Sequence, residues 1–169
     1  FSVNESKNLY KDDIALAYAY ADCIKSEIDQ LQKVGCERIQ LDEPVLTEAP
    51  NECEWAADII NDIVNTFPNL HFSLHICGGN AHRKRGYFGK YTDMLSGLKK
   101  LKVHELHLEY CTLHYNMLDV FDLYNFKGIL SFGVIDQRSD QDESIELIHD
   151  RIKPVYNKFG SDKILLSSE

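Results

Sequence analysis

The chain has 169 residues, of which 44% are hydrophobic and 27% charged, and its formal net charge is −9 at pH 7. These values are typical of a folded domain with one sizeable core. The acidic balance argues against nucleic-acid and anionic-membrane partners, and no apolar run approaches the length of a membrane span. Five cysteines without paired spacing, in a sequence where nothing resembles a secretion signal, predict reduced thiols and a cytoplasmic location.

Hydrophobic periodicity predicts a first helix followed by alternating strands and helices. The expected helices are 12–34, 51–67, roughly 91–101, a short one near 117–124, and 141–159, and the expected strands are 37–42, 71–77, 104–110, 128–136 and 163–167. The strands begin about 25–35 residues apart, which is the length of a right-handed βαβ unit. The pattern therefore predicts a parallel sheet with helices between its strands.

Two parallel architectures compete, an open doubly wound sheet and a (β/α)₈ barrel. No glycine-rich nucleotide-binding motif follows any strand, and polar residues gather at the carboxyl ends of several strands, as in barrels: Asp42, His75, Cys77, Glu109 and Asp136. Five strands are too few to close a barrel. We therefore predict an α/β fold that forms the C-terminal half, about strands 4 to 8, of a TIM barrel. Residues 1–169 would be a single partial barrel domain within a longer chain.

His75 and Cys77 are two residues apart on one strand, so both side chains point to the same face. A His-x-Cys pair alone is more often a buried cysteine beside a hydrogen-bonded histidine than a metal site. Strand alternation also directs Asp42 and Glu109 inward at the same rim. Imidazole, thiol and carboxylate are all zinc-ligand types, so both a zinc site and a metal-free polar network are compatible with this spacing.

Four segments together resemble one enzyme family. Ile39–Leu46 (IQLDEPVL) is similar to the Q-[IL]-D-E-P-x-L segment of cobalamin-independent methionine synthase. His75–Asn80 (HICGGN) is similar to the H-x-C-x-G-N segment of the shorter members of that thiol-alkyltransferase superfamily. His107–Tyr110 (HLEY) resembles the family's glutamate-bearing strand, and Phe132–Asp136 (FGVID) its G-V-x-D strand. The segments occur in the family's order, and in that family they lie in the part of a (β/α)₈ barrel that contains its fourth to eighth strands.

The resemblance implies functional roles at the carboxyl ends of the strands. The implied zinc ligands are His75, Cys77 and Glu109, the implied substrate-binding residues are Asp42 and Glu43, and the implied catalytic residues are Asp42 and Asp136. The implied reaction is zinc-dependent methyl (alkyl) transfer to a thiol, with homocysteine converted to methionine. A free thiol is mostly protonated at neutral pH, because its pKa is about 8.5. Coordination to zinc would remove the proton and make the sulfur nucleophilic.

Two features differ from the family pattern: a zinc-ligating cysteine that residues 1–169 lack, and an arginine in place of a histidine. The family's fourth zinc ligand is a cysteine in a Cys-Gly step after the eighth strand, and we expect such a step within about three residues of Glu169. Arg138 stands where the large folate-using enzymes carry a histidine, and arginine cannot protonate a leaving nitrogen, which argues against a methylfolate donor. The donor is left open. The basic run 83–85 could bind an anionic group, but a solvated basic loop is the preferred interpretation. Tyr87 and Phe88 could stack on a flat ligand, and burial against a neighbouring helix explains them equally well.

Two other functions remain compatible with the sequence. One is a metal-free barrel of the uroporphyrinogen-decarboxylase type, and the other is a non-catalytic homologue that binds a partner. The small-molecule partners implied by the resemblance are a homocysteine-like thiol and a methyl donor. Residues 1–169 alone are expected to be inactive, because an incomplete barrel exposes strand edges and apolar faces. They would need the missing half-barrel or would self-associate.

Overall fold

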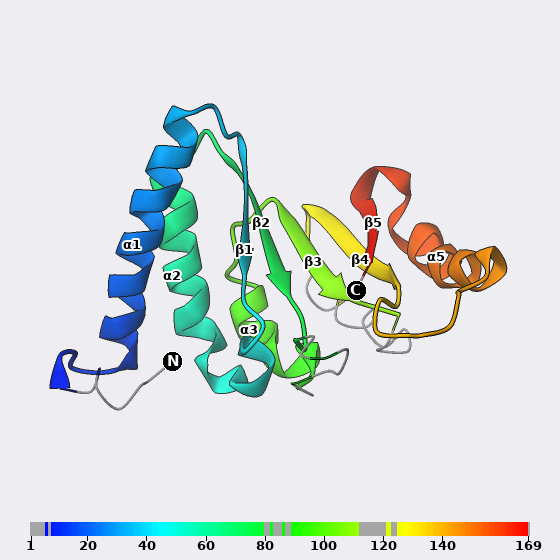
Figure 1. The fold of residues 1–169 in the computed structure, drawn as a ribbon, viewed down its shortest axis with the longest axis horizontal. Coiled ribbons are helices and arrows are strands. Elements are labelled where there is room, and N and C mark those ends of the chain that lie inside the picture. The colour runs from blue at the N-terminus through cyan, green and yellow to red at the C-terminus, as the bar shows by residue number, and fades with distance from the viewer. Residues whose placement is uncertain are drawn as a thin grey trace.

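Five parallel strands form one sheet whose spatial order follows their order in the chain (Figure 1). The computed structural model describes residues 6, 8–79, 82, 86, 89–111, 121–122 and 125–168. Within these ranges the strands are β1 (Arg38–Asp42), β2 (His71–Ile76), β3 (Glu105–Glu109), β4 (Ile129–Ile135) and β5 (Ile164–Ser168), and the helices are α1 (Asp13–Lys33), α2 (Cys53–Thr66), α3 (Leu95–Leu98) and α5 (Ile145–Phe159). Short 3₁₀ turns occupy Leu46–Glu48, Pro50–Glu52, Tyr91–Met94 and Ser161–Lys163.

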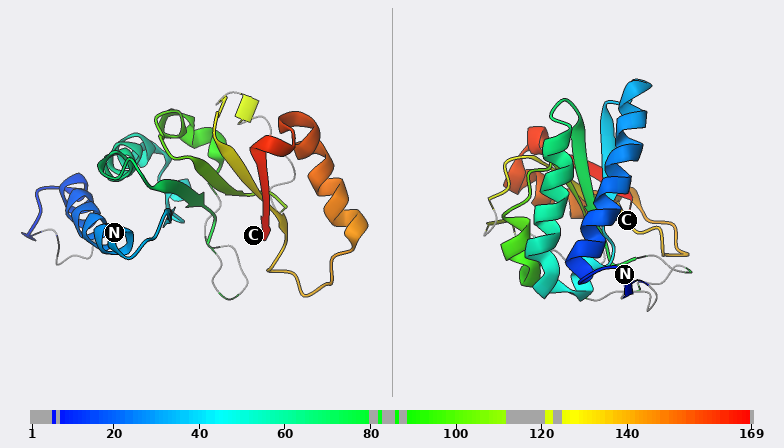
Figure 2. Two further views of the ribbon diagram at one scale, coloured as in Figure 1. Left: turned by 90° about the horizontal axis from the view of Figure 1, so that it is seen from above. Right: turned by 90° about the vertical axis from the view of Figure 1, so that its left-hand side faces the viewer.

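The sheet is curved, and the helices of the described ranges lie along its outer side. Viewed from above, the strands trace an arc, with α1, α2, α3 and α5 along the outside (Figure 2). A sequential parallel order with helices on one side is the arrangement of a (β/α) barrel and differs from that of a doubly wound sheet, which has helices on both faces. The predicted fold class is therefore confirmed. All carboxyl ends of the strands lie at one edge, the lower edge in Figure 1.

Local sequence signals account for the ends of the two longest helices. The Asp12 carboxylate accepts a hydrogen bond from the backbone N–H of Ala15 at 2.8 Å, and Ser144 caps α5 in the same way on Leu147. Such caps satisfy N–H groups that have no partner within the helix. Gly35 and Gly160 follow the two helices with φ of +92° and +77°, a conformation that glycine adopts without a Cβ clash.

Alternation along β2 divides its side chains between two faces. Phe72, Leu74 and Ile76 are fully buried against the helices. His71, Ser73 and His75 have the opposite parity and face the concave side. The parallel register pairs Asp42 with His75, and His75 with His107. The polar residues of neighbouring strands are thus aligned in rows on the concave face.

The predicted elements agree with the structure apart from the third helix. All five strands are confirmed with shifts of one residue at their ends, and the first, second and last helices are confirmed with slightly shorter bounds. The helix predicted over 91–101 is wrong in extent, because a 3₁₀ turn occupies Tyr91–Met94 and α3 spans only Leu95–Leu98. Gly97 lies close to the backbone of Cys53 on α2, so this segment is shaped by packing. Most of the helix predicted near 117–124 lies outside the described residues.

Candidate functional site

A polar pocket of about 200 Å³ lies at the carboxyl ends of β2, β3 and β5. It is lined by Gln40, His75, Cys77, His107, Leu108, Glu109, Gln137, Arg138, Ser167 and Ser168. Every strand except β4 contributes a lining residue, and the loop after β4 contributes two. Convergence of polar side chains from several strand ends is the usual construction of a barrel active site.

His75 and Cys77 form a hydrogen-bonded pair inside this pocket. Hydrogen bonding to Cys77 raises the pKa of the His75 imidazole, although burial opposes the shift. The same bond, together with the backbone N–H of Gly79 at 3.3 Å from the sulfur, lowers the pKa of the Cys77 thiol. Burial and the nearby Glu109 carboxylate raise the pKa of this thiol, but the two hydrogen bonds outweigh them. The pair therefore makes Cys77 easier to deprotonate than a free cysteine, and the thiolate is the form that attacks electrophiles and binds metals.

Glu109 lies at the end of β3 with its side chain almost fully buried. The Arg138 guanidinium forms an ion pair with Oε1 of this carboxylate. The buried Tyr91 hydroxyl donates to the carbonyl of Ile76 at 2.7 Å and accepts from the backbone N–H of Glu109 at 3.4 Å. Tyr91 thus ties the end of β2 to the end of β3. Glu109 and the His75–Cys77 pair are held at one rim by this link.

A second charged cluster lies on the same strands, nearer their start than the pocket is. The Glu105 carboxylate is buried and is ion-paired with Arg38. Its Oε1 lies 2.7 Å from Nε2 of His71, and its Oε2 lies 3.1 Å from Nε2 of His107. Burial opposes ionisation, but the hydrogen bonds from these three partners outweigh it and lower the pKa of Glu105. This Glu105 cluster fixes the ring of His107, which lines the pocket floor.

Asp136 follows β4, and its contacts are with the backbone and with neighbouring loop residues. Its Oδ1 accepts from the backbone N–H of Arg138 at 2.9 Å, and its own N–H donates to Oε2 of Glu143 at 2.9 Å. Glu143 is in turn ion-paired with Arg151 at 2.6 Å. Arg151 also donates to the carbonyl of Val134 at 2.7 Å. These contacts fix the loop that carries Gln137 and Arg138 into the pocket.

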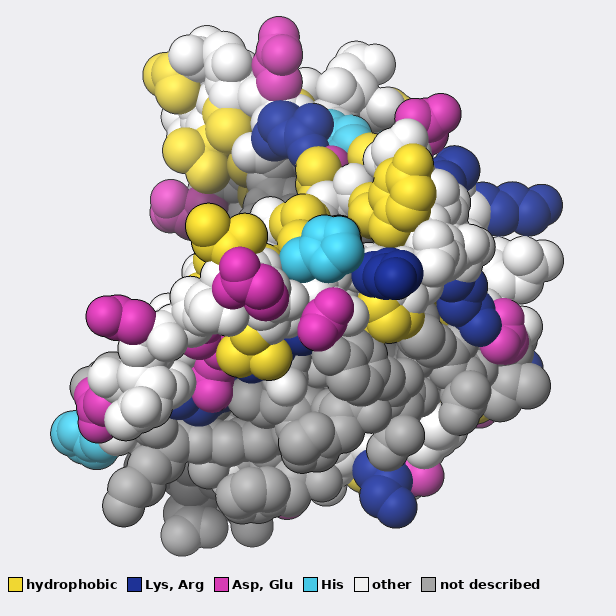
Figure 3. Space-filling model, turned by 90° about the vertical axis from the view of Figure 1, so that its right-hand side faces the viewer, with side chains coloured by type: hydrophobic (Ala, Val, Ile, Leu, Met, Phe, Trp, Pro, Cys, Tyr) yellow, Lys and Arg dark blue, Asp and Glu magenta, His cyan; other side chains and the backbone are white. Residues whose placement is uncertain are grey.

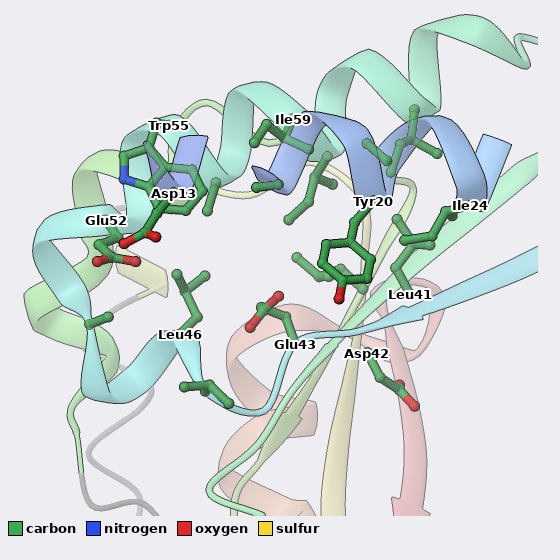
Figure 4. Close-up of a pocket in the computed structure, with 18 of the residues that line it drawn as sticks. Asp13, Tyr20, Ile24, Leu41, Asp42, Glu43, Leu46, Glu52, Trp55 and Ile59 are labelled. Atoms are coloured by element: carbon green, nitrogen blue, oxygen red, sulfur yellow. The ribbon is translucent and has the colours of Figure 1, made fainter. Parts of the chain in front are cut away.

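A larger, mostly apolar groove of about 610 Å³ lies between α1, α2 and the free edge of β1 (Figure 4). The Glu43 side chain points into this groove, whereas that of Asp42, which lies at the edge of the groove, points away from it. Burial raises the pKa of the Glu43 carboxyl. The two adjacent acidic side chains thus point in opposite directions at the end of β1.

The opposite end of the sheet is also only partly covered. Leu165 and Leu166 of β5 are 42% and 48% exposed. The space-filling view of this end shows hydrophobic side chains grouped around a histidine, with charged residues nearby (Figure 3). Exposed apolar side chains thus lie on α1 near β1 and on β5, and each of these two strands has an unpaired edge among the described residues.

The structure brings together four of the six predicted site residues. His75, Cys77 and Glu109 line the pocket, and Asp42 contacts His75 with 3.3 Å between Oδ1 and Nδ1. Glu43 lies in the apolar groove, and the Asp136 carboxylate is engaged by the backbone of its own loop. In the described part of the chain, no three His, Cys, Asp or Glu side chains are close enough together to enclose a metal ion.

Sequence reasoning missed several residues of this pocket. His107, Gln40, Ser167 and Ser168 line it but were not selected as site residues. The parity that selects Glu109 also selects His107, two residues earlier, so this signal was present. Three features of the sequence lie outside the described residues: the basic run 83–85, the aromatic residues Tyr87 and Phe88, and Asn80. No helix in the described ranges is long and apolar enough to cross a membrane.

The fold and the pocket define a (β/α)-barrel protein with nitrogen, sulfur and oxygen donors at the carboxyl ends of its strands. The family model described as "Cobalamin-independent synthase, Catalytic domain" matches residues 6–168. The chain belongs to this family.

Relatives with known names and structures agree with this assignment. The chain is 26% identical to a methionine synthase of Saccharolobus islandicus (strain L.S.2.15 / Lassen #1), over 95% of the chain and 45% of the relative. It is 30% identical to a methionine synthase of Pyrococcus furiosus, over 95% and 44%. A B12-independent methionine synthase from Shewanella sp. W3-18-1, solved in complex with selenomethionine, shares the fold with a TM-score of 0.80 and 22% identity, over 94% of the chain and 48% of that structure. The chain thus spans less than half the length of these relatives.

Proposed function

We propose that the protein containing this chain transfers a methyl group to a thiol in a zinc-dependent reaction, and that it converts homocysteine to methionine. The observation that carries the proposal is the convergence of His75, Cys77 and Glu109 on one pocket at the barrel rim. Family membership and the names of the relatives support the reaction class. The small polar pocket also suits a small zwitterionic substrate better than an extended polymer.

The residues present fit zinc in their chemistry. Imidazole, thiolate and carboxylate are all common zinc ligands, and the lowered pKa of Cys77 favours the form that binds metal. His75, Cys77 and Glu109 would hold the ion. Zinc, when bound, would lower the pKa of a substrate thiol and so supply a nucleophilic sulfur at neutral pH. Arg138 must release Glu109 or share it for this ligand set to form.

The remaining polar residues would bind and orient the substrate. Asp42 lies beside His75 with its side chain 65% exposed, so its carboxylate is accessible to the amino group of a thiol amino acid. The Glu43 side chain points into the apolar groove and that of Asp42 points away from it, which supports Asp42 as the residue that binds the substrate amino group. Asp136 would act by fixing the backbone of Arg138 at the pocket wall.

We assign the apolar groove to the remainder of the barrel. A neighbouring parallel strand that paired with the free edge of β1 would direct alternate side chains into the space between α1 and α2. Tyr20 and Ile24 line this space and are 49% and 39% exposed. Apolar side chains from such a strand would cover them. The relatives, which are more than twice as long as this chain, contain additional chain that could supply that strand.

A metal-free binding role is the second candidate, because the Glu109 carboxylate is already ion-paired with Arg138. In that case the pocket would hold a ligand through hydrogen bonds and Arg138 would remain in place. Zinc content distinguishes the two functions, since only the first requires a metal.

The test uses the full-length protein, purified without chelators and analysed for zinc and for methyl transfer to homocysteine. We expect about one zinc per chain in the wild type. Cys77→Ala should lose zinc and activity together, whereas Cys23→Ala, which alters an exposed cysteine on α1, should retain both. Full zinc occupancy in Cys77→Ala would contradict the proposed metal site.

A further inference from the structure

Arg138 crosses the rim of the sheet and connects three strand ends. It extends from the loop after β4, donates to the carbonyl of Gly79 after β2 at 3.1 Å, and is ion-paired with Glu109 at the end of β3. The side chain of Arg138 is 10% exposed and that of Glu109 is 1% exposed. The ion pair is therefore shielded from water. Charge-assisted hydrogen bonds are stronger in such an environment than in water.

The position of Arg138 is set by its backbone as well as by its side chain. The Asp136 carboxylate holds the N–H of Arg138, and Glu143 holds the N–H of Asp136. Glu143 is itself paired with Arg151, which is only 13% exposed. A loop that is fixed at successive points delivers the guanidinium to Glu109 at little further cost in conformational entropy.

The ion pair involves the same carboxylate that the proposed zinc site requires. A buried carboxylate is costly without a compensating charge, and in this arrangement the guanidinium provides it. A divalent cation at Glu109 would bring a second positive charge next to Arg138. Because like charges at short range repel, metal and guanidinium compete for this oxygen.

We propose that Arg138 acts as a competitor for the metal: it holds Glu109 in the metal-free protein and releases the carboxylate when zinc binds. The inference rests on the proposed function, since it concerns the same site. Before the metal binds, Arg138 neutralises the charge of the Glu109 carboxylate. Because zinc must displace it, Arg138 also lowers the affinity of the site for zinc. It is a positioning residue with respect to Glu109, with no contact to reacting atoms required.

The test measures zinc affinity of the full-length protein by competition with a chromogenic chelator. Arg138→Met removes the charge and the donors while keeping an unbranched, flexible side chain, so it should bind zinc roughly ten-fold or more tightly than the wild type. The zinc affinity of Arg138→Lys should lie between that of Arg138→Met and that of the wild type. In the absence of zinc, Arg138→Met should unfold at a lower temperature than the wild type, and saturation with zinc should narrow that difference.

The matched control is Arg38→Met, which removes another arginine that pairs with a buried carboxylate, Glu105, at a distance from the pocket. Its zinc affinity should equal that of the wild type. If Arg138→Met is not folded, Arg138→Gln takes its place. Unchanged or weaker zinc binding in a folded Arg138 variant would overturn the inference and leave the zinc site intact. Failure of the wild type itself to bind zinc would instead overturn the proposed function.

Discussion

Oδ1 of Asp42 lies 3.3 Å from Nδ1 of His75, on the neighbouring strand of the sheet. The register pairs these two residues directly, so the contact follows from strand pairing. In metal sites a carboxylate beside the free nitrogen of a ligating histidine orients the ring and raises its basicity. Asp42 therefore has two separable properties, an oxygen that accepts from His75 and a negative charge that can attract a substrate ammonium.

Substitution of Asp42 separates these two properties. Asp42→Asn keeps an oxygen acceptor for His75 but loses the charge, so zinc content should stay at the wild-type level. The KM for the thiol amino acid should rise about ten-fold, because one ion pair to the substrate is lost. Asp42→Ala removes the acceptor as well, and its zinc affinity should fall by about 10- to 100-fold. Steady-state kinetics and chelator competition measure the two effects. Loss of zinc in Asp42→Asn would show that the negative charge of Asp42 is needed for metal binding and would contradict its assignment to the substrate.

In the Glu105 cluster, we expect substitution of Glu105 to destabilise the fold more than substitution of Arg38. Glu105 is 4% exposed and contacts three partners, whereas Arg38 is 63% exposed and can turn to water. Glu105→Gln should therefore reduce the free energy of unfolding by about 1–3 kcal/mol, and Arg38→Gln by less than about 1 kcal/mol. Urea unfolding of the full-length protein measures both. Equal losses in the two variants would show that the ion pair, and not the burial of Glu105, determines the effect.

Strand order and rim composition were predictable because alternation and spacing are local properties of the sequence. Phe72, Leu74 and Ile76 alternate with polar residues, and a one-residue slip would expose all three, so the face of His75 is fixed by the sequence alone. The same parity identifies Glu109 as inward. Resemblance to the family then added the chemical roles.

Contacts between side chains distant in sequence were not predictable in this way. The pairing of Arg138 with Glu109 depends on the conformation of the loop after β4, which Asp136 and Glu143 determine. The direction of Glu43 into the groove depends on the separation of α1 from β1. No period in the sequence encodes these geometries, because they arise from packing between elements.

The Glu143–Arg151 ion pair predicts a pH-dependent contribution to stability. The bond to Arg151, and to a lesser extent that to the N–H of Asp136, lower the pKa of Glu143 from its ordinary value of 4.5, although burial opposes the shift. A carboxyl group whose pKa is lower in the folded state stabilises the fold above its unfolded-state pKa, and this contribution is lost as the pH falls through the folded-state pKa. Glu143→Gln should therefore reduce the free energy of unfolding by about 1–2 kcal/mol at pH 7.

This difference between Glu143→Gln and the wild type should shrink below about pH 4.5 and vanish at lower pH, once Glu143 is protonated in both states. Chemical unfolding of the full-length protein at pH 7 and at several values below pH 5 measures the trend. Glu27→Gln, which alters an exposed carboxylate on α1, serves as the control and should show little effect at either pH. A Glu143→Gln effect that is independent of pH would exclude the ion pair as its cause.

The apolar groove predicts how residues 1–169 behave when they are produced alone. The free edge of β1 offers backbone hydrogen-bonding groups, and Tyr20 and Ile24 expose apolar surface next to it. Exposed edges of this kind pair with other chains. We expect the 169-residue polypeptide to self-associate at micromolar concentration and to lack methyl transfer activity.

Charged substitutions within the groove distinguish this surface from the rest of α1. Tyr20→Lys combined with Ile24→Lys should shift sedimentation velocity profiles toward smaller species, because lysine side chains cannot be buried against another apolar surface without a large desolvation cost. The control is Tyr18→Lys with Leu31→Lys, which alters residues of similar exposure on α1 that do not line the groove. Its profile should match that of the unsubstituted polypeptide. A monodisperse, fully active monomer of residues 1–169 would contradict both the groove assignment and the need for the remainder of the barrel.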